Sequence, residues 1–293
     1  MKILLTGRTG QVGYELERSL QGLGEIVAVD RAHMNLADLD SVRRTIREVR
    51  PDLIVNPAAY TAVDQAEKEP DLAMCVNGEA PGVMAEEAAR LGAAMIHYST
   101  DYVFDGTKAG AYTETDAPCP LNVYGRSKLA GEQAIQASGI PHLIFRTSWV
   151  YGLRGKNFLL TVRRLAQERD ELRIVNDQHG APTWCRTIAD TTAHVVARLS
   201  RTSNCIGLDQ DLLRAKGGVY HLAAQGQTTW HGFAQTIVAH KSTNKKPAVL
   251  PINTQDYPLP ARRPANSVLS CERLAGAFCG LPAWDKALLL CLD

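Results

Sequence analysis

The chain has 293 residues, a formal net charge of +1 and a hydrophobic fraction of 45%. These values are typical of a globular α/β protein with a second, smaller lobe, and they argue against a surface that binds polyanions. No apolar run approaches the roughly 20 residues of a membrane-spanning helix. The seven cysteines include no C-x-x-C pair and the eight histidines show no metal-ligand spacing. We therefore predict a cytoplasmic protein that binds neither nucleic acid nor membrane and has no dedicated metal site.

The first half alternates short apolar runs with amphipathic stretches. Buried strands are predicted at Ile3–Thr6, Ile26–Asp30, Leu53–Asn56, Ala94–Ser99 and Leu143–Thr147. Helices are predicted at Val12–Gln21, Ser41–Val49, Leu72–Leu91 and Tyr124–Ala137, with a kink or break at Pro81. This alternation predicts a Rossmann-like, doubly wound parallel α/β sheet.

The second half has a looser pattern. Helices are predicted at Phe158–Glu168, Ile188–Leu199, His231–His240 and Trp284–Leu292, and strands at Leu172–Val175 and Val219–Ala223. Residues 201–218 are polar and are predicted as a loop or insertion, and the five prolines of residues 247–264 predict irregular chain. We expect a dinucleotide-binding domain over residues 1–150, with core contributions from residues 184–225, and a substrate-binding α/β lobe over residues 151–293.

A glycine-rich loop follows the first predicted strand. Gly7, Gly10 and Gly13 form a G-x-x-G-x-x-G pattern where the strand turns into a helix. Glycine permits a positive φ there and leaves room for a phosphate, and the helix N-terminus offers free N–H groups to an anion. The loop therefore predicts a site for a dinucleotide pyrophosphate. The alternative is a tight turn without a ligand.

Charged residues near the second strand bear on the choice of cofactor. Asp30 ends that strand, where a carboxylate binds both ribose hydroxyls of NADH. Arg31 follows it and Arg8 lies in the glycine loop, and either guanidinium can bind the 2′-phosphate of NADPH. These opposing charges predict that both cofactors work, with NADPH modestly preferred.

Tyr124 and Lys128 are one helical turn apart and share a helix face. A nearby ammonium is expected to lower the pKa of the phenol, which then protonates a carbonyl oxygen as hydride reaches the carbon. Ser99 and Thr100 follow the fourth strand, at the sheet edge where such folds bind ligands. The alternative for the Tyr124–Lys128 pair is an exposed helix pair without a catalytic role.

Seven motifs together resemble a known family. They are Thr6-Gly-Arg-Thr-Gly-Gln-Val-Gly13, Asn56-Pro-Ala-Ala-Tyr-Thr-Ala-Val-Asp64, Tyr98-Ser-Thr-Asp-Tyr-Val-Phe-Asp-Gly106, Pro120-Leu-Asn-Val-Tyr-Gly-Arg-Ser-Lys-Leu-Ala-Gly-Glu132, Arg146-Thr-Ser-Trp-Val-Tyr151, Asn176-Asp-Gln-His-Gly-Ala-Pro-Thr183 and Arg263-Pro-Ala-Asn-Ser267. From Met1 to about Leu274 the chain resembles the extended short-chain dehydrogenase/reductases and, within them, the dTDP-4-dehydrorhamnose reductase family.

The resemblance implies a set of site residues. Thr100, Tyr124 and Lys128 would be catalytic. The cofactor would contact Gly7, Gly10, Gln11, Val12, Gly13, Asp30, Arg31, Asn35, Leu36, Ala58, Ala59, Tyr60, Thr61, Tyr124 and Lys128. The substrate, a nucleotide-activated sugar, would contact Thr100, Asp101, Trp149, Asn176 and Arg263.

The activity implied is NAD(P)H-dependent reduction of the C4 keto group of dTDP-4-dehydro-L-rhamnose, by a monomer or a homodimer. Some family members bind magnesium at a dimer contact; the sequence shows no acidic cluster for it, so magnesium use stays open. Two alternatives are another nucleotide-sugar epimerase, dehydratase or reductase of the superfamily and a non-catalytic regulatory binding subunit. Dehydratases usually carry Thr-Asp-Glu, whereas Tyr102 follows Thr100-Asp101 here.

Overall fold

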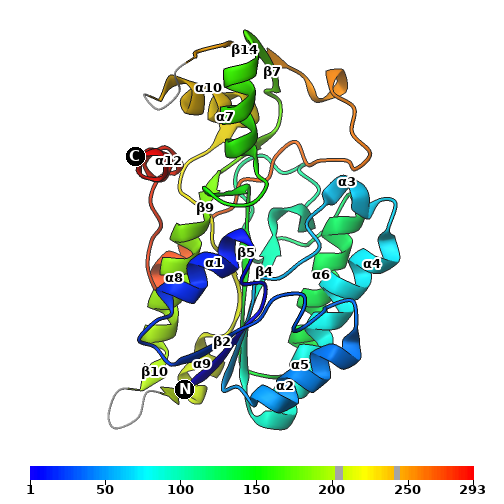
Figure 1. The fold of residues 1–293 in the computed structure, drawn as a ribbon, viewed down its shortest axis with the longest axis vertical. Helices are drawn as coiled ribbons and strands as arrows, with labels where there is room; N and C mark the ends of the chain where they lie inside the picture. Colours follow the sequence, from blue (N-terminus) through cyan, green and yellow to red (C-terminus); the bar gives the residue numbers. More distant parts are fainter. Residues whose placement is uncertain (202–206, 241–244) are drawn as a thin grey trace.

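A six-stranded parallel sheet organises the chain (Figure 1). The structure is a computed structural model that describes residues 1–201, 207–240 and 245–293. The strand order is β12-β5-β4-β3-β1-β2. The strands are β1 (Lys2–Leu5), β2 (Glu25–Ala28), β3 (Leu53–Asn56), β4 (Ala94–Thr100), β5 (His142–Thr147) and β12 (Gly218–His221). The predicted Rossmann-like class is confirmed, and β12 brings a segment of the second half into the sheet.

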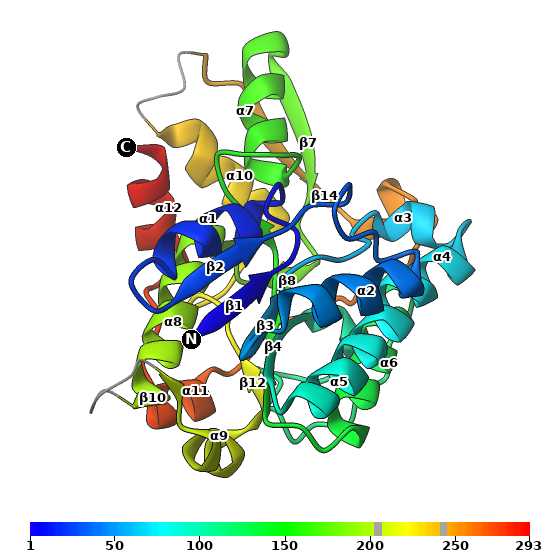
Figure 2. The same cartoon turned by 60° about the horizontal axis from the view of Figure 1, so that its bottom comes forward.

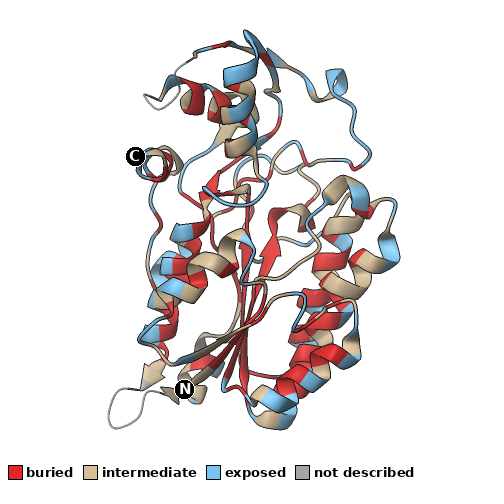
Figure 3. Cartoon of the chain, viewed as in Figure 1, coloured by how far each residue is buried: buried red, intermediate tan, exposed pale blue. Residues whose placement is uncertain are grey.

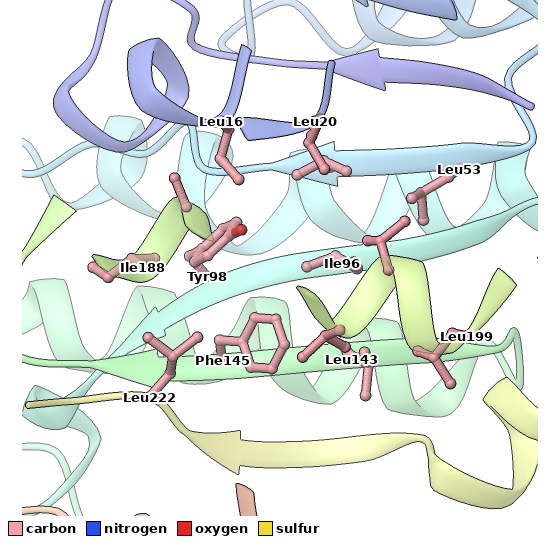
Figure 4. Close-up of a cluster of buried hydrophobic side chains, with 14 of the residues drawn as sticks. Leu16, Leu20, Leu53, Ile96, Tyr98, Leu143, Phe145, Ile188, Leu199 and Leu222 are labelled. Atoms are coloured by element: carbon pink, nitrogen blue, oxygen red, sulfur yellow. The ribbon is translucent and has the colours of Figure 1, made fainter. Parts of the chain in front are cut away.

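Helices cover both faces of the sheet (Figure 2). One face carries α2 (Leu39–Val49), α5 (Ala80–Leu91) and α6 (Val123–Ala137); the other carries α1 (Gln11–Ser19) and α8 (Cys185–Arg198), with α9 (Gln210–Lys216) and α11 (Glu272–Ala277) near its lower end. Leu16 and Leu20 meet Ile188 and Leu199 over strand residues such as Ile96 (Figure 4). The strands other than β2, which lies at the edge of the sheet, are largely buried (Figure 3).

A smaller lobe lies beyond the carboxyl edge of the sheet. It is built from α7 (Phe158–Glu168), β7 (Glu171–Val175), α10 (Trp230–Ala239), β14 (Ala248–Ile252), η3 (Thr254–Asp256) and α12 (Trp284–Leu292). Four short strands lie nearby: β6 (Val150–Tyr151) pairs with β9 (Thr183–Trp184), and β8 (His179–Gly180) pairs with β13 (Thr228–Thr229). Aromatic side chains including Tyr151 and Phe233 fill the core of this lobe.

Two local expectations need correction, and a third is confirmed. The helix predicted over residues 72–91 has the interruption expected near Pro81: α4 (Pro70–Met74) is followed by a π-helical turn η1 (Cys75–Glu79) and then α5, because the ring of Pro81 cannot continue the regular hydrogen-bond ladder. Within the predicted loop 201–218, the strands β10 (Ser200–Arg201) and β11 (Gly207–Leu208) pair, and α9 starts where the Asp209 side chain accepts a 3.0 Å bond from the Leu212 N–H. Residues 202–206 of that loop lie outside the described chain. Residues 248–252, predicted irregular, form β14, where Pro251 is tolerated because the strand pairs only with β7.

Candidate active site

The glycine loop is shaped for a close approach to its helix. Gly7 has a φ of +59°, and the Gly10 N–H donates to the Gly7 carbonyl at 2.9 Å. A Cβ on Gly13 would lie 2.1 Å from that carbonyl oxygen, so only glycine fits. No side chain caps the start of α1 at Gly10. The first N–H groups of α1 therefore remain available to an anion, as a pyrophosphate requires.

A cavity of about 210 Å³ opens beside this loop. Its walls include Gly7, Asp30, Arg31, Asn35, Leu36, Ala58, Ala59 and Tyr60, which are eight of the residues predicted for the cofactor. They come from the ends of β1, β2 and β3, so the sheet brings distant segments together at one edge. The shape and polarity of these walls fit the adenosine part of a dinucleotide.

Asp30 and the two nearby arginines have different surroundings. The Asp30 carboxylate accepts bonds from the Ala32 N–H at 3.0 Å and from His33 Nδ1 at 2.7 Å, and the His33 contact lowers the pKa of Asp30. Arg31 lines the cavity. Arg8 instead pairs with Glu17 at 3.0 Å and lines a separate surface groove. Arg8 Nη1 also lies 3.5 Å from the Ala28 carbonyl at the end of β2, so of the two arginines Arg31 lines the cavity and Arg8 lies outside its walls.

Asn77 ties the cofactor side of the site to the catalytic helix. Its side chain accepts from the Tyr60 N–H at 2.8 Å and donates to the Tyr60 carbonyl at 3.0 Å and to Ser127 Oγ at 3.0 Å. The Tyr60 hydroxyl donates to Glu69 at 2.6 Å, and this bond is the main reason its pKa rises to about 12. Tyr60 therefore lines the cavity, while its hydroxyl is hydrogen-bonded to Glu69.

The end of β4 and the start of α6 meet at Thr100 and Tyr124. Asn122 caps α6 by accepting from the Gly125 N–H at 2.8 Å, which fixes Tyr124 in the first turn. The Thr100 hydroxyl lies close enough to the Tyr124 phenol to affect its pKa. Thr100 Oγ1 donates to Asp101 at 2.9 Å. A phenol, an alcohol and a carboxyl group therefore lie together at this point.

Burial dominates the electrostatics of this cluster. It raises the pKa of Tyr124 to about 12 and that of Asp101 to about 6, and it lowers the pKa of Lys128 to about 8. The expectation that Lys128 lowers the pKa of Tyr124 is not met in this ligand-free structure. Lys128 Nζ lies instead 3.1 Å from His97 Nε2.

The residues predicted for the substrate lie between the sheet and the smaller lobe. Trp149 has a φ of +47° and stacks on Trp230, with 3.7 Å between ring centroids. Asn176 accepts a bond from the Thr229 hydroxyl at 2.7 Å. Trp149 directly precedes β6, whereas Trp230 follows β13 and begins α10.

Arg263 forms a paired contact with the other side of the site. Its guanidinium donates two 2.6 Å bonds to the two carboxylate oxygens of Asp64, in α3 (Val63–Ala66). It also donates to the Ala261 carbonyl at 2.6 Å and lies close to Tyr102. A diphosphate approaching Arg263 must share it with Asp64, a partner that sequence reasoning did not identify.

Seven of the fifteen predicted cofactor residues lie off the cavity walls: Gly10, Gln11, Val12, Gly13, Thr61, Tyr124 and Lys128. Gln11 accepts a 2.7 Å bond from Asn157, Val12 packs against the core, and Thr61 is exposed. Sequence reasoning also missed the buried pair Asn56 and His97. The sequence did contain one indication of this pair, because His97 is a polar residue in the middle of a strand predicted to be buried.

Two further properties concern metal binding and membrane insertion. In residues 1–201, 207–240 and 245–293, no group of three or more His, Cys, Asp or Glu side chains is placed to hold a metal ion. Over the same part of the chain, every helix is too short or too polar to cross a membrane.

The fold and site define an oxidoreductase of the short-chain, dinucleotide-binding class. The family model described as RmlD substrate binding domain matches residues 1–293, and the chain belongs to this family. It is 51% identical to the dTDP-4-dehydrorhamnose reductase of Burkholderia thailandensis, over 100% of this chain and 98% of that protein. It is 45% identical to the Escherichia coli protein of that name, over 97% and 95% of the two chains. A Bacillus anthracis dTDP-4-dehydrorhamnose reductase solved in complex with NADP is 33% identical, with a TM-score of 0.87 over 99% of this chain and 98% of that one.

Proposed function

We propose that this protein reduces the C4 carbonyl of dTDP-4-dehydro-L-rhamnose to give dTDP-L-rhamnose, with NADPH as the preferred reductant and NADH also usable. The relatives named for this reaction match nearly the whole chain. The observation that carries the proposal within the site is the placement of Thr100 at the end of β4 beside Tyr124 in the first turn of α6, with Lys128 one helical turn away. The NADP-bound relative supports the choice of cofactor.

The chain's own residues account for the proton. Because its pKa is about 12, the Tyr124 phenol is protonated at neutral pH and remains a stronger acid than a sugar alcohol. A bound reduced nicotinamide supplies the hydride that forms the new C4–H bond. Tyr124 gives its proton to the carbonyl oxygen as the C=O π bond breaks. Thr100 holds that oxygen beside the phenol, and Lys128 supplies positive charge near the phenolate that remains.

Asp101 and Trp149 are proposed to hold the sugar. The Asp101 carboxylate is 3% exposed and lies beside Ser267, and its Oδ2 is proposed to accept a bond from a sugar hydroxyl. The Trp149 indole offers an apolar face. Arg263 and Asn176 are proposed to face the nucleotide diphosphate. Arg263 would then give up one of its two hydrogen bonds to Asp64.

The proposal also includes a cytoplasmic location. The six described cysteines are free thiols, as a reducing compartment favours.

The direct test is to incubate the purified protein with dTDP-4-dehydro-L-rhamnose and NADPH and to follow loss of the reduced-cofactor absorbance together with the sugar product. We expect one dTDP-L-rhamnose for each NADPH consumed. The variant Tyr124→Phe should lose turnover. Tyr220→Phe is a matched control, because Tyr220 lies on the outer strand and donates its hydroxyl to the Lys216 carbonyl at 2.7 Å. Equal activity of the two variants would refute the assigned proton donor.

A further inference from the structure

A buried polar chain connects Lys128 to the strand that precedes the glycine loop. Asn56 in β3 and His97 in β4 are opposite each other in the sheet register, and both are completely buried. Lys128 Nζ lies 3.1 Å from His97 Nε2, and His97 Nδ1 lies 3.1 Å from Asn56 Nδ2. The other end of that amide, Asn56 Oδ1, accepts from Thr6 Oγ1 at 2.6 Å. Thr6 directly precedes Gly7, so the chain runs from the catalytic helix to the cofactor loop.

The donors and acceptors in this chain allow two arrangements. An ammonium has only donors, and a neutral imidazole has one donor and one acceptor. If Lys128 is charged, His97 Nε2 accepts and His97 Nδ1–H donates to an oxygen of Asn56. A neutral Lys128 amine can accept as well as donate, which also permits His97 Nε2–H to donate to it while Nδ1 accepts from the Asn56 amide, the orientation in the structure. The Thr6 hydroxyl suits both, because it can donate or accept.

The charges around Lys128 favour the first arrangement at neutral pH. Burial lowers the pKa of Lys128 to about 8, and the Glu132 carboxylate one turn away acts in the opposite direction. Arg146 from β5 pairs with Glu132 at 2.6 Å. Among the described residues, Tyr124 and Asp101 are the other titratable groups on the Tyr124 side of Lys128. Because the pKa of about 8 lies above neutral pH, most Lys128 side chains carry a proton there.

Complete burial and the nearby Lys128 hold the pKa of His97 well below its ordinary value, so the ring is neutral. Only a neutral ring has the free acceptor that an ammonium needs. Without that acceptor, a buried ammonium would lose a charge-assisted hydrogen bond, which is among the stronger kinds.

We propose that His97 is a positioning residue for Lys128: its neutral Nδ1–H imidazole accepts a hydrogen bond from the ammonium at Nε2. This inference rests on the proposed function only in giving Lys128 a catalytic task. It follows that His97 helps to set the pH above which the enzyme loses activity.

The first test needs neither substrate nor activity. Nitrogen-15 NMR of the histidine rings distinguishes the Nδ1–H from the Nε2–H tautomer, and the His97 signals are assigned by their absence in His97→Gln. We expect the Nδ1–H tautomer at about pH 7, where Lys128 carries a proton. The Nε2–H tautomer at that pH would overturn the proposal. A protein inactive as a reductase but with the expected tautomer would refute the proposed function alone.

The second test follows kcat/KM against pH. In His97→Leu the ammonium has no acceptor, so the pKa of Lys128 falls and the alkaline loss of activity should move to lower pH by about one unit, equivalent to about 1.4 kcal/mol. His97→Gln keeps an acceptor at a similar reach and should restore most of the shift. His221→Gln is the control, because His221 is equally buried but contacts the Tyr112 and Ser270 carbonyls instead. The same alkaline limb in all three variants would contradict the proposal; if His97→Leu does not fold, the tautomer measurement decides.

Discussion

Replacing the buried Asp101 by asparagine should stabilise the protein at neutral pH while impairing catalysis. Asp101 is 3% exposed, and burial raises its pKa from 3.8 to about 6. The native state therefore holds this proton more tightly than the unfolded chain does, and the unfolding free energy falls as pH rises from about 4 to about 6. At about 1.4 kcal/mol per pH unit, the ionised carboxylate costs up to about 3 kcal/mol above pH 6. Asp101→Asn removes that cost because an amide does not ionise.

The assay is urea unfolding of wild type and Asp101→Asn at several pH values between about 4 and 7. We expect the variant's stability advantage to grow over this range and then level off. Asp105→Asn is a control from the same segment, because three hydrogen bonds from Thr107 and Tyr112 keep the pKa of Asp105 below 3.8. Its effect should be a loss of stability that is constant over this range. A difference between wild type and Asp101→Asn that does not change with pH would refute the reasoning.

Three further variants test the site. Tyr124→Phe should lower kcat by about 10²-fold or more with little change in NADPH binding, since it removes the acid but keeps the ring; near wild-type turnover would contradict this. Lys128→Ala should lower both kcat and cofactor affinity, and an unchanged affinity by titration would exclude a cofactor contact. Arg31→Ala should raise KM for NADPH but not for NADH. Arg8→Ala is the control and should change neither KM, because the Arg8 guanidinium pairs with Glu17 in the wild type. Equal losses for both cofactors in Arg31→Ala would show that Arg31 does not contact the 2′-phosphate.

The sequence is most informative where the structure depends on local pattern. Strands buried on both faces must be apolar throughout, so β1 and β3–β5 are visible as short apolar runs. The glycine loop and the spacing of Tyr124 and Lys128 are likewise local, because each lies within a single turn or helix.

Contacts between distant segments could not be predicted in this way. Asp64 and Arg263 are 199 positions apart, and the stacked Trp149 and Trp230 belong to different elements. Their pairing follows from how the smaller lobe packs against the sheet, which periodicity does not encode. The polar composition of α9 led to the prediction of a loop there. Pro251 led to the prediction of irregular chain at β14, although proline is tolerated in a strand that is paired on one side.

The central claim is net reduction at C4 with a proton from Tyr124. The most direct measurement uses NADPH labelled with deuterium at the hydrogen it transfers, incubated with the protein and dTDP-4-dehydro-L-rhamnose, followed by mass spectrometry and NMR of the sugar. The account predicts one deuterium at C4 of dTDP-L-rhamnose for each cofactor oxidised, and almost none with Tyr124→Phe in the same time. A sugar product without deuterium, or isomerisation without net oxidation of the cofactor, would contradict it.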